Sequence, residues 1–289
     1  MDFVTYLFFI FLVMLIGITP FFILYGVSDF VRFILHRVIG YRKGVVRSNL
    51  RKVFPEKSKK ELRQIENDSY KNLADIFVEG VKGFTMSKKS IMKRHKLLNP
   101  EILDKYYDKN QGVIVAAGHF GNWEWGAFSA AYYTKSTIIG LYKPFTNRYI
   151  NNYVVKSRAV AGTILVPLIK TPRYFNKYAG KPSVFFMIAD QSPSNKNKAI
   201  WANFFGIETA FLQGIEYYSK KFNLPVLFVN MSRKGRMMYE YSVEIMVENP
   251  NETKEGEITQ LFATKLESLI RANPGSWLWS HKRWKHSKS

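Results

Sequence analysis

The first 28 residues form one continuous apolar block. No charged residue occurs from Phe3 to Ser28, and the block exceeds the roughly 20 apolar residues that span a bilayer. A buried core helix is the alternative, but soluble core helices seldom run this long without a charge. Pro20 interrupts the block, so it permits a kink or a shallow re-entrant insertion in place of a full span. We therefore expect a transmembrane or membrane-inserted helix over residues 1–28.

Basic residues follow this block and indicate its orientation: Arg32, Arg37, Arg42, Lys43 and Arg47. Because Lys and Arg beside a membrane segment stay predominantly on the cytoplasmic side, we expect residues 29–289 to be cytoplasmic.

The segment from Ser58 to Met86 has the pattern of an amphipathic helix. Its apolar residues recur at helical spacing, at Leu62, Ile65, Leu73, Ile76, Phe77, Val81 and Phe84. Ser58 and Glu61 have the spacing of a capping box, in which each side chain bonds the backbone N–H of the other. We therefore predict a basic, amphipathic helical region over residues 29–98.

Short apolar runs that do not alternate with polar residues appear after Asn99. They are Gly112–Gly118, Ser136–Tyr142, Thr163–Leu168, Ser183–Ala189 and Leu224–Val229. Runs of this kind are typical of strands that are buried on both faces of a sheet.

Helix-like stretches separate these runs, at residues 147–158 and 211–221. Residues 239–247 alternate better and favour an edge strand, and residues 255–272 favour a closing helix. Alternating strands and helices predict an α/β core over residues 99–289, with a mostly parallel central sheet flanked by helices.

The net charge of the chain indicates which classes of partner it can bind. The 43 basic and 22 acidic residues give a net charge of +21. Such a surface attracts nucleic acid, anionic lipid headgroups or phosphorylated substrates. The chain has no cysteine, which excludes disulfides, thiolate nucleophiles and Cys-ligated zinc. The five histidines show no metal-binding spacing, so we expect neither a metal site nor a cofactor.

The basic, Trp-rich tail has two interpretations. Residues 277–285 mix indoles with cations, the composition of a membrane interface belt. The alternative is that the tryptophans pack in the core.

A histidine and a carboxylate follow the first buried run. His119 and Glu124 lie five residues apart, which on one continuous helix would separate them by roughly 140°. Gly121 and Asn122 supply the turn that lets them meet, with Asn122 as the N-cap of the next helix. Ligand sites form at the carboxyl ends of such strands. The pair can therefore act as a His–carboxylate couple, with Glu124 orienting His119 as a general base, or the histidine is merely a hydrogen-bonded residue at a strand end.

Polar residues also lie at the carboxyl ends of two further apolar runs, Ser136–Tyr142 and Ser183–Ala189. Tyr142 and Lys143 can bind a phosphate of donor or acceptor, or simply form the turn before Pro144. Asp190 and Gln191 are candidates for acceptor binding or for support of the catalytic pair.

An ordered set of short motifs resembles one family. The set comprises NLRKVFPE at residues 49–56, HFGNWE at 119–124, YKP at 142–144, Arg158, ADQ at 189–191, FFG at 204–206, Thr209-Ala210, and WLWSHKRWK at 277–285. His-x4-Asp/Glu after a hydrophobic strand resembles the glycerolipid and lysophospholipid acyltransferases, and the whole set resembles their lipid A biosynthesis branch. Ala189-Asp190 stands where Pro-Asp is frequent in that branch.

The resemblance implies direct transfer of a fatty acyl chain from acyl-carrier protein or acyl-CoA to a hydroxyl of a lipid A precursor. His119 would be the base and Glu124 its orienting group. Arg158 would stabilise the oxyanion or hold a phosphate, or is a solvated helix residue. The enzyme would lie in a bacterial inner membrane, bind anionic lipid there, and bind no nucleic acid. A lysophospholipid or aminolipid acceptor stays open, as does a membrane-tethered protein that binds polyanions.

Overall fold

A computed structural model describes residues 1–288, and all of their side chains except that of Ala127. It divides the N-terminal block into α1 (Asp2–Ile18) and α2 (Phe21–Phe33), followed by the π-helical turn η1 (Ile34–Val38). The break falls at Thr19-Pro20, where Thr19 is extended, because a residue before proline avoids the helical region. Within residues 1–288 no helix is both long and apolar enough to cross a membrane, so the predicted transmembrane helix is unsupported.

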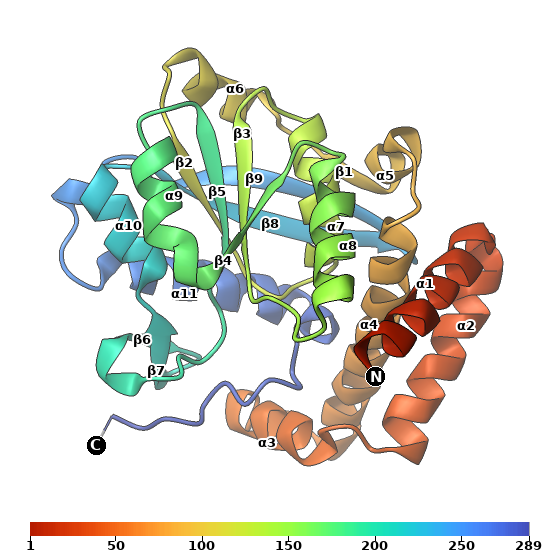
Figure 1. The fold of residues 1–289 in the computed structure, drawn as a ribbon. Coiled ribbons are helices and arrows are strands. Elements are labelled where there is room, and N and C mark those ends of the chain that lie inside the picture. The colour runs from red at the N-terminus through yellow and green to blue at the C-terminus, as the bar shows by residue number, and fades with distance from the viewer. Residues whose placement is uncertain (289) are drawn as a thin grey trace.

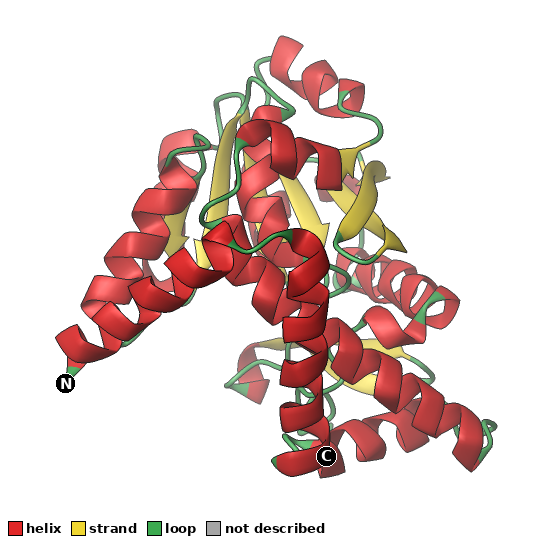
Figure 2. Ribbon diagram, turned by 90° about the vertical axis from the view of Figure 1, so that its right-hand side faces the viewer, coloured by secondary structure: helices red, strands yellow, loops and turns green. Residues whose placement is uncertain are grey.

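The two N-terminal helices expose a large apolar surface. Figure 2 shows α1 and α2 meeting at an angle. Their large apolar side chains that stay exposed, here called the apolar face, are Phe3, Val4, Leu7, Phe8, Phe11, Met14, Leu15, Ile18, Phe22, Ile23, Phe30 and Phe33. Soluble proteins normally expose large apolar side chains one at a time, whereas this face gathers many of them on two helices.

A mostly helical segment follows, and it ends at the short strand His95–Leu97, which lies inside the helical region predicted for residues 29–98. It contains α3 (Lys43–Val53), α4 (Lys59–Gly83) and α5 (Lys88–Arg94). The capping box at the start of α4 is confirmed: the Ser58 backbone N–H donates to Glu61 Oε2 at 2.8 Å, and the Glu61 N–H donates to Ser58 Oγ at 3.3 Å. The Lys82 ammonium donates to the carbonyls of Ile16, Gly17 and Thr19, so α4 caps the end of α1.

A seven-stranded sheet forms the core, in the order β1-β9-β8-β2-β5-β3-β4 (Figure 1). The strands are β1 (His95–Leu97), β2 (Val113–Ala117), β3 (Thr137–Tyr142), β4 (Ile164–Pro167), β5 (Ser183–Ile188), β8 (Val226–Gly235) and β9 (Met238–Val247). All neighbours are parallel except β8 and β9. The predicted fold class, a mostly parallel sheet flanked by helices, is confirmed.

The helices of this core are α6 (Glu101–Asp108), α7 (Trp123–Ser129), α8 (Arg148–Ala159), α9 (Thr171–Tyr178), α10 (Gly214–Phe222) and α11 (Glu257–Ala272). Short 3-10 turns lie at Ala130–Tyr132, Leu168–Lys170, Lys196–Lys198, Pro250–Glu252 and Pro274–Ser276.

Two sequence predictions in this region are wrong. β9 lies between β1 and β8 and is not an edge strand; the edge is the three-residue β1, which is too short to produce a periodic signal. The helix predicted from residue 211 starts at Gly214, because a hairpin of β6 (Ala199–Phe204) and β7 (Ile207–Leu212) occupies the preceding segment. Its two-residue turn, Phe205-Gly206, has positive φ at both positions, as the twist of a tight hairpin requires.

The Trp-rich tail packs in the core and does not form an interface belt. Trp277, Trp279 and Arg283 are each 2% exposed or less. Asn49 of α3 donates to the carbonyls of Trp279 and His281, both at 2.8 Å. A β-bridge between Trp277 and Phe120, just after β2, places the tail beside the carboxyl end of that strand.

Candidate active site

The loop after β2 makes the sharp turn that the sequence predicts. Gly121 has φ +59°, and a Cβ at this position would lie 2.5 Å from Met231 Sδ, so only glycine fits. Asn122 is the N-cap of α7, because its Oδ1 accepts the backbone N–H of Trp125 at 2.9 Å. The turn and the cap predicted at these two residues are confirmed.

The tail holds this loop through backbone hydrogen bonds. The N–H of Gly121 donates to the Ser276 carbonyl at 3.0 Å, and the N–H of Leu278 donates to the His119 carbonyl at 3.1 Å. The backbone on both sides of Phe120 is thereby fixed.

Asp190 is the carboxylate that contacts His119. Its Oδ1 lies 2.5 Å from His119 Nδ1, and its Oδ2 accepts the His119 backbone N–H at 2.8 Å. The strand register explains the pairing: Ala117 of β2 lies opposite Ile188 of β5, so the residues two places beyond each strand end are also side by side. Trp277 Nε1 donates to the same Oδ2 at 2.7 Å, so the tail supports this carboxylate.

The charges of this pair stabilise each other. Burial disfavours the imidazolium, but the charge and hydrogen bond of Asp190, with a contribution from Glu124, outweigh it and raise the pKa of His119. Burial likewise opposes the Asp190 carboxylate, yet His119 and the Trp277 indole lower the pKa of Asp190 to about 2. Asp190 is therefore ionised at neutral pH, as an orienting group must be.

Glu124 has a different partner from the one that the sequence suggested. Its Oε2 forms an ion pair with the guanidinium of Arg158, from the last turn of α8. Glu124 follows Asn122 in the first turn of α7, beyond the cap, and from there its carboxylate reaches α8. It influences His119 through charge, whereas the hydrogen bond to Nδ1 comes from Asp190. In the structure the carboxylate that contacts His119 Nδ1 is therefore that of Asp190, whereas the sequence suggested Glu124.

The other ring nitrogen of His119 faces Gln191 at a cavity. His119 Nε2 lies 3.2 Å from Gln191 Nε2. The cavity has a volume of about 670 Å³, within the usual range for small-molecule sites. His119, Glu124, Arg158 and Gln191 all line it. Buried Arg158 Nε has no hydrogen-bond partner among the described residues.

Tyr142 and Lys143 line the same cavity. The Tyr142 hydroxyl donates to Asn151 Oδ1 at 3.2 Å, which holds the ring against α8. Of the seven candidate residues, six therefore line one cavity, and Asp190 stands directly behind His119.

The lining of the cavity combines polar and apolar side chains. The polar residues include Lys143, Gln191, Ser194, Asn195 and Lys198. Apolar side chains form most of the remainder: Leu141, Phe145, Leu165, Leu168, Phe186, Met187, Ile188, Leu212 and Ile215. Such a site can hold a long apolar chain and bind a charged headgroup at the same time.

Sequence analysis missed the contribution of the tail. Trp277 supports Asp190, and His281 Nε2 accepts the backbone N–H of Ser192 at 2.9 Å, which requires a neutral imidazole. Burial lowers the pKa of His281 to about 4, consistent with that acceptor role. The signal was present in the WLWSHKRWK motif, but nothing in its composition distinguished support of the site from membrane contact.

Comparisons with known proteins give one result. The family model for bacterial lipid A biosynthesis acyltransferases matches residues 2–286. The chain is 22% identical over 249 residues to a lipid A biosynthesis palmitoleoyltransferase of Escherichia coli (strain K12), covering 84% of this chain and 79% of that protein. A lipid A biosynthesis acyltransferase of Shigella flexneri matches to the same extent.

Proposed function

The chain belongs to the bacterial lipid A biosynthesis acyltransferase family and is an acyltransferase, and we propose that it transfers a fatty acyl chain from a thioester to a hydroxyl of a lipid A precursor, with His119 as the general base. The observation that carries this proposal is the orientation of the His119 ring, whose two nitrogens face different groups. Asp190 holds Nδ1, while Nε2 lies at a cavity that Arg158 also lines. A base oriented in this way can take a proton from a bound hydroxyl.

The reaction needs no acyl-enzyme. Neutral His119 takes the hydroxyl proton at Nε2 as the hydroxyl oxygen attacks the thioester carbonyl. The tetrahedral oxyanion forms and then collapses, the C–S bond breaks, and the imidazolium returns the proton to the leaving thiolate. The products are an ester and a free thiol.

Asp190 and Arg158 have separate roles in this mechanism. Asp190 keeps the proton of the neutral ring on Nδ1 and stabilises the imidazolium that forms. Arg158 stabilises the oxyanion through its rigid fork of N–H donors, and Glu124 positions that fork. Tyr142, Lys143 and Gln191 bind polar groups of the substrates at the wall of the cavity.

The acyl donor in this proposal is acyl-carrier protein in preference to coenzyme A. Acyl-carrier proteins are acidic, and the net charge of +21 favours docking of an acidic protein. Coenzyme A is also anionic, so the preference rests on the family resemblance together with this charge. Acylation of a lysophospholipid or an aminolipid is the alternative, because the same base and cavity serve any lipid hydroxyl.

We place the enzyme on the cytoplasmic side of a bacterial inner membrane, docked through the apolar face of α1 and α2. The exposed Phe and Leu side chains suit a bilayer interface, and the basic residues after α2 suit anionic headgroups. Docking of this kind is shallow and leaves the α/β core in water.

One comparison tests the catalytic proposal. Purified enzyme on anionic vesicles is given acyl-carrier-protein thioester and either a lipid A precursor or a lysophospholipid, and the products are read by mass spectrometry. We expect acylated lipid A precursor, and a rate about 10²- to 10⁴-fold lower for folded His119→Ala. Equal turnover by that variant would refute the mechanism, and transfer to the lysophospholipid alone would reassign the acceptor.

A further inference from the structure

A buried carboxylate on α4 holds the loop that carries the catalytic base. We propose that Glu79 is a positioning residue for acyl transfer: through Asn122 it sets the place of the His119 loop and of the first turn of α7. This inference rests on the proposed function for its kinetic consequence. Its structural basis is independent of the substrate.

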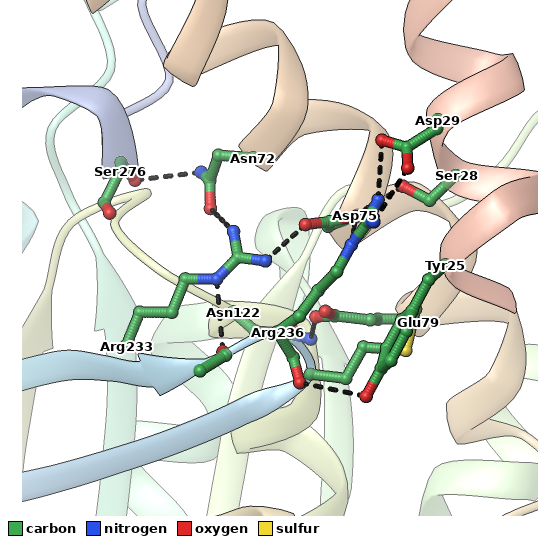
Figure 3. Close-up of polar contacts among 12 residues, drawn as sticks. Tyr25, Ser28, Asp29, Asn72, Asp75, Glu79, Asn122, Arg233, Arg236 and Ser276 are labelled. Carbon is green, nitrogen blue, oxygen red and sulfur yellow. Dashed lines mark hydrogen bonds and ion pairs between the residues drawn. The ribbon is translucent and has the colours of Figure 1, made fainter. Parts of the chain in front are cut away.

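Glu79 is fully buried and contacts the loop directly. Its Oε2 accepts Asn122 Nδ2 at 2.5 Å, and the Tyr239 hydroxyl donates to the same carboxylate at 2.9 Å. The Glu79 backbone carbonyl also accepts the Trp125 indole N–H at 2.8 Å. One residue of α4 therefore binds both the N-cap of α7 and a side chain of its first turn. Figure 3 shows the first of these contacts, between Glu79 and Asn122.

Asn122 has no freedom left after these contacts. It is fully buried, its Oδ1 caps α7, and its Nδ2 donates to Glu79. His119 lies three residues before it and Glu124 two residues after it. A shift of the Asn122 amide would therefore move the base on one side and the partner of Arg158 on the other.

The helix that carries Glu79 packs closely on α7. A Cβ at Gly83 would lie 3.0 Å from Phe128 Cε2, and a Cβ at Gly80 would lie 3.9 Å from Glu124 Cγ. Glycine at position 83 lets the α4 backbone approach α7 closely, whereas a Cβ at position 80 would only make ordinary contact with Glu124. The Glu79–Asn122 bond is thus formed across a tight contact that cannot slide easily.

Packing alone does not account for a carboxylate at this position. The two arginines nearby form their ion pairs with Asp75, one turn earlier on α4, and Glu79 has amide and hydroxyl partners. Burial together with the Asp75 charge raises the pKa of Glu79 to about 7, although Arg233, Tyr239 and Asn122 oppose that rise. A buried group that is this costly to ionise is a poor choice for packing alone, whereas a strong acceptor aimed at Asn122 is what positioning of the loop requires.

An exchange of acid and amide tests the pair. Asn122→Asp keeps the cap and, when assayed well above the pKa of Glu79, sets two carboxylates against each other at the 2.5 Å contact. Glu79→Gln alone keeps an acceptor for Asn122, through its carbonyl oxygen. The double variant restores a donor–acceptor pair in the opposite direction, because the amide introduced at position 79 can donate to the carboxylate introduced at position 122.

We expect single-turnover transfer by Asn122→Asp to fall at least tenfold at saturating donor, with a KM change of less than about twofold, since a displaced base slows the chemical step and leaves the binding cavity intact. Glu79→Gln replaces the carboxylate by the weaker acceptor of an amide oxygen, so it should lose some activity, but less than Asn122→Asp. The double variant should recover to within about threefold, a coupling that independent sites would not show.

Glu216→Gln is the matched control. Glu216 is also a buried carboxylate, but it accepts from Gly256 and Thr259 at the start of α11. It should lower the melting temperature without changing the single-turnover rate. Circular dichroism confirms that each variant is folded before its rate is compared.

A second measurement does not depend on acyl transfer. The pKa of His119, followed by NMR, reports its contact with Asp190. It should fall towards the ordinary histidine value in Asn122→Asp and return in the double variant. The proposal would be overturned by an unchanged His119 pKa in Asn122→Asp, or by a His119 pKa that does not return in the double variant. Both results count even if the wild type transfers no acyl chain. Absence of wild-type turnover alone would count only against the proposed function.

Discussion

Replacing Asp190 by Asn removes the charge beside His119 and keeps the shape of the side chain. The two carboxylate oxygens have different partners: Oδ2 accepts the His119 backbone N–H and the Trp277 indole, whereas Oδ1 contacts His119 Nδ1. In the variant, the single amide oxygen remains with the two donors at Oδ2. The amide NH2 therefore faces Nδ1, which must accept, and the ring proton moves to Nε2, the nitrogen that has to take the proton of the acceptor hydroxyl.

This change of tautomer determines the expected loss. A ring protonated at Nε2 cannot take a proton from the acceptor, and its imidazolium has lost its carboxylate. Loss of the same role in a Ser-His-Asp triad costs about 10⁴-fold in kcat, so we expect a decrease of about 10²- to 10⁴-fold. Single-turnover transfer from acyl-carrier-protein thioester to the lipid A precursor measures it, on protein checked for folding.

The pH profile supplies an independent sign. Asp190 raises the pKa of His119, and the base must be neutral, so the wild-type rate should rise with pH through a value above 6.5. Without the Asp190 charge, the residual activity of Asp190→Asn should rise at a lower pH. If the rate of Asp190→Asn rose only at a higher pH than that of the wild type, the assigned contact between Asp190 and His119 would be contradicted.

Glu124→Gln is the comparison that decides between the two carboxylates. It leaves Asp190 and the tautomer intact and loosens Arg158, so we expect a smaller loss, about tenfold. If Asp190→Asn stayed within threefold of the wild type while Glu124→Gln abolished transfer, Glu124 would be the orienting group and our assignment would be refuted.

Three further predictions follow from other parts of the structure. Arg158→Lys keeps the charge but loses the planar fork, so kcat should fall about 10²-fold with little change in donor KM; a pure rise in KM would show that Arg158 binds a ground-state phosphate instead. Gly214→Ala places a methyl 2.9 Å from Met187 Cε at the cavity wall, so the preferred acyl chain, measured by competition, should shorten, with each lost CH2 contact worth about 0.8 kcal/mol or about fourfold; an unchanged preference would place the chain elsewhere. Replacing Phe8 and Phe11, which are 62% and 60% exposed on the apolar face, by Ser should weaken vesicle binding, whereas Ile245→Ser on β9 should not; equal binding by both variants would exclude this face as the docking surface.

The strands that the sequence predicted well are those that form one unbroken apolar run, although each run is short. The buried strands β2, β3, β4, β5 and β8 were each predicted from a run of apolar residues. The break at Pro20 was also foreseen as a kink, but whether the two helices still formed a span depends on packing. Lys82, more than 60 residues along the chain, caps α1 at that break, and no local pattern reports such a contact.

The error over the partner of His119 has the same origin. Glu124 was favoured because it is near in sequence, whereas Asp190 is 71 residues away and becomes adjacent only because β2 and β5 are neighbours in register. Strand order is set by how the crossover helices pack, which apolar runs do not encode. With that order known, the pairing of residues 119 and 190 follows by counting from Ala117 and Ile188.

Helix α4 connects the two surfaces that a lipid-modifying enzyme has to align. Towards the N-terminal helices, Asp75 accepts from Ser28, and Arg236 bridges Asp75 to Asp29 of α2. Towards the active site, Glu79 holds Asn122 one turn further along the same helix. Because a helix advances about 5.4 Å per turn and bends little, the docking helices and the catalytic loop keep a fixed separation and angle. On the proposed docking through the apolar face, the height of His119 above the bilayer is therefore set by α4, and the acceptor hydroxyl must reach that height from the membrane.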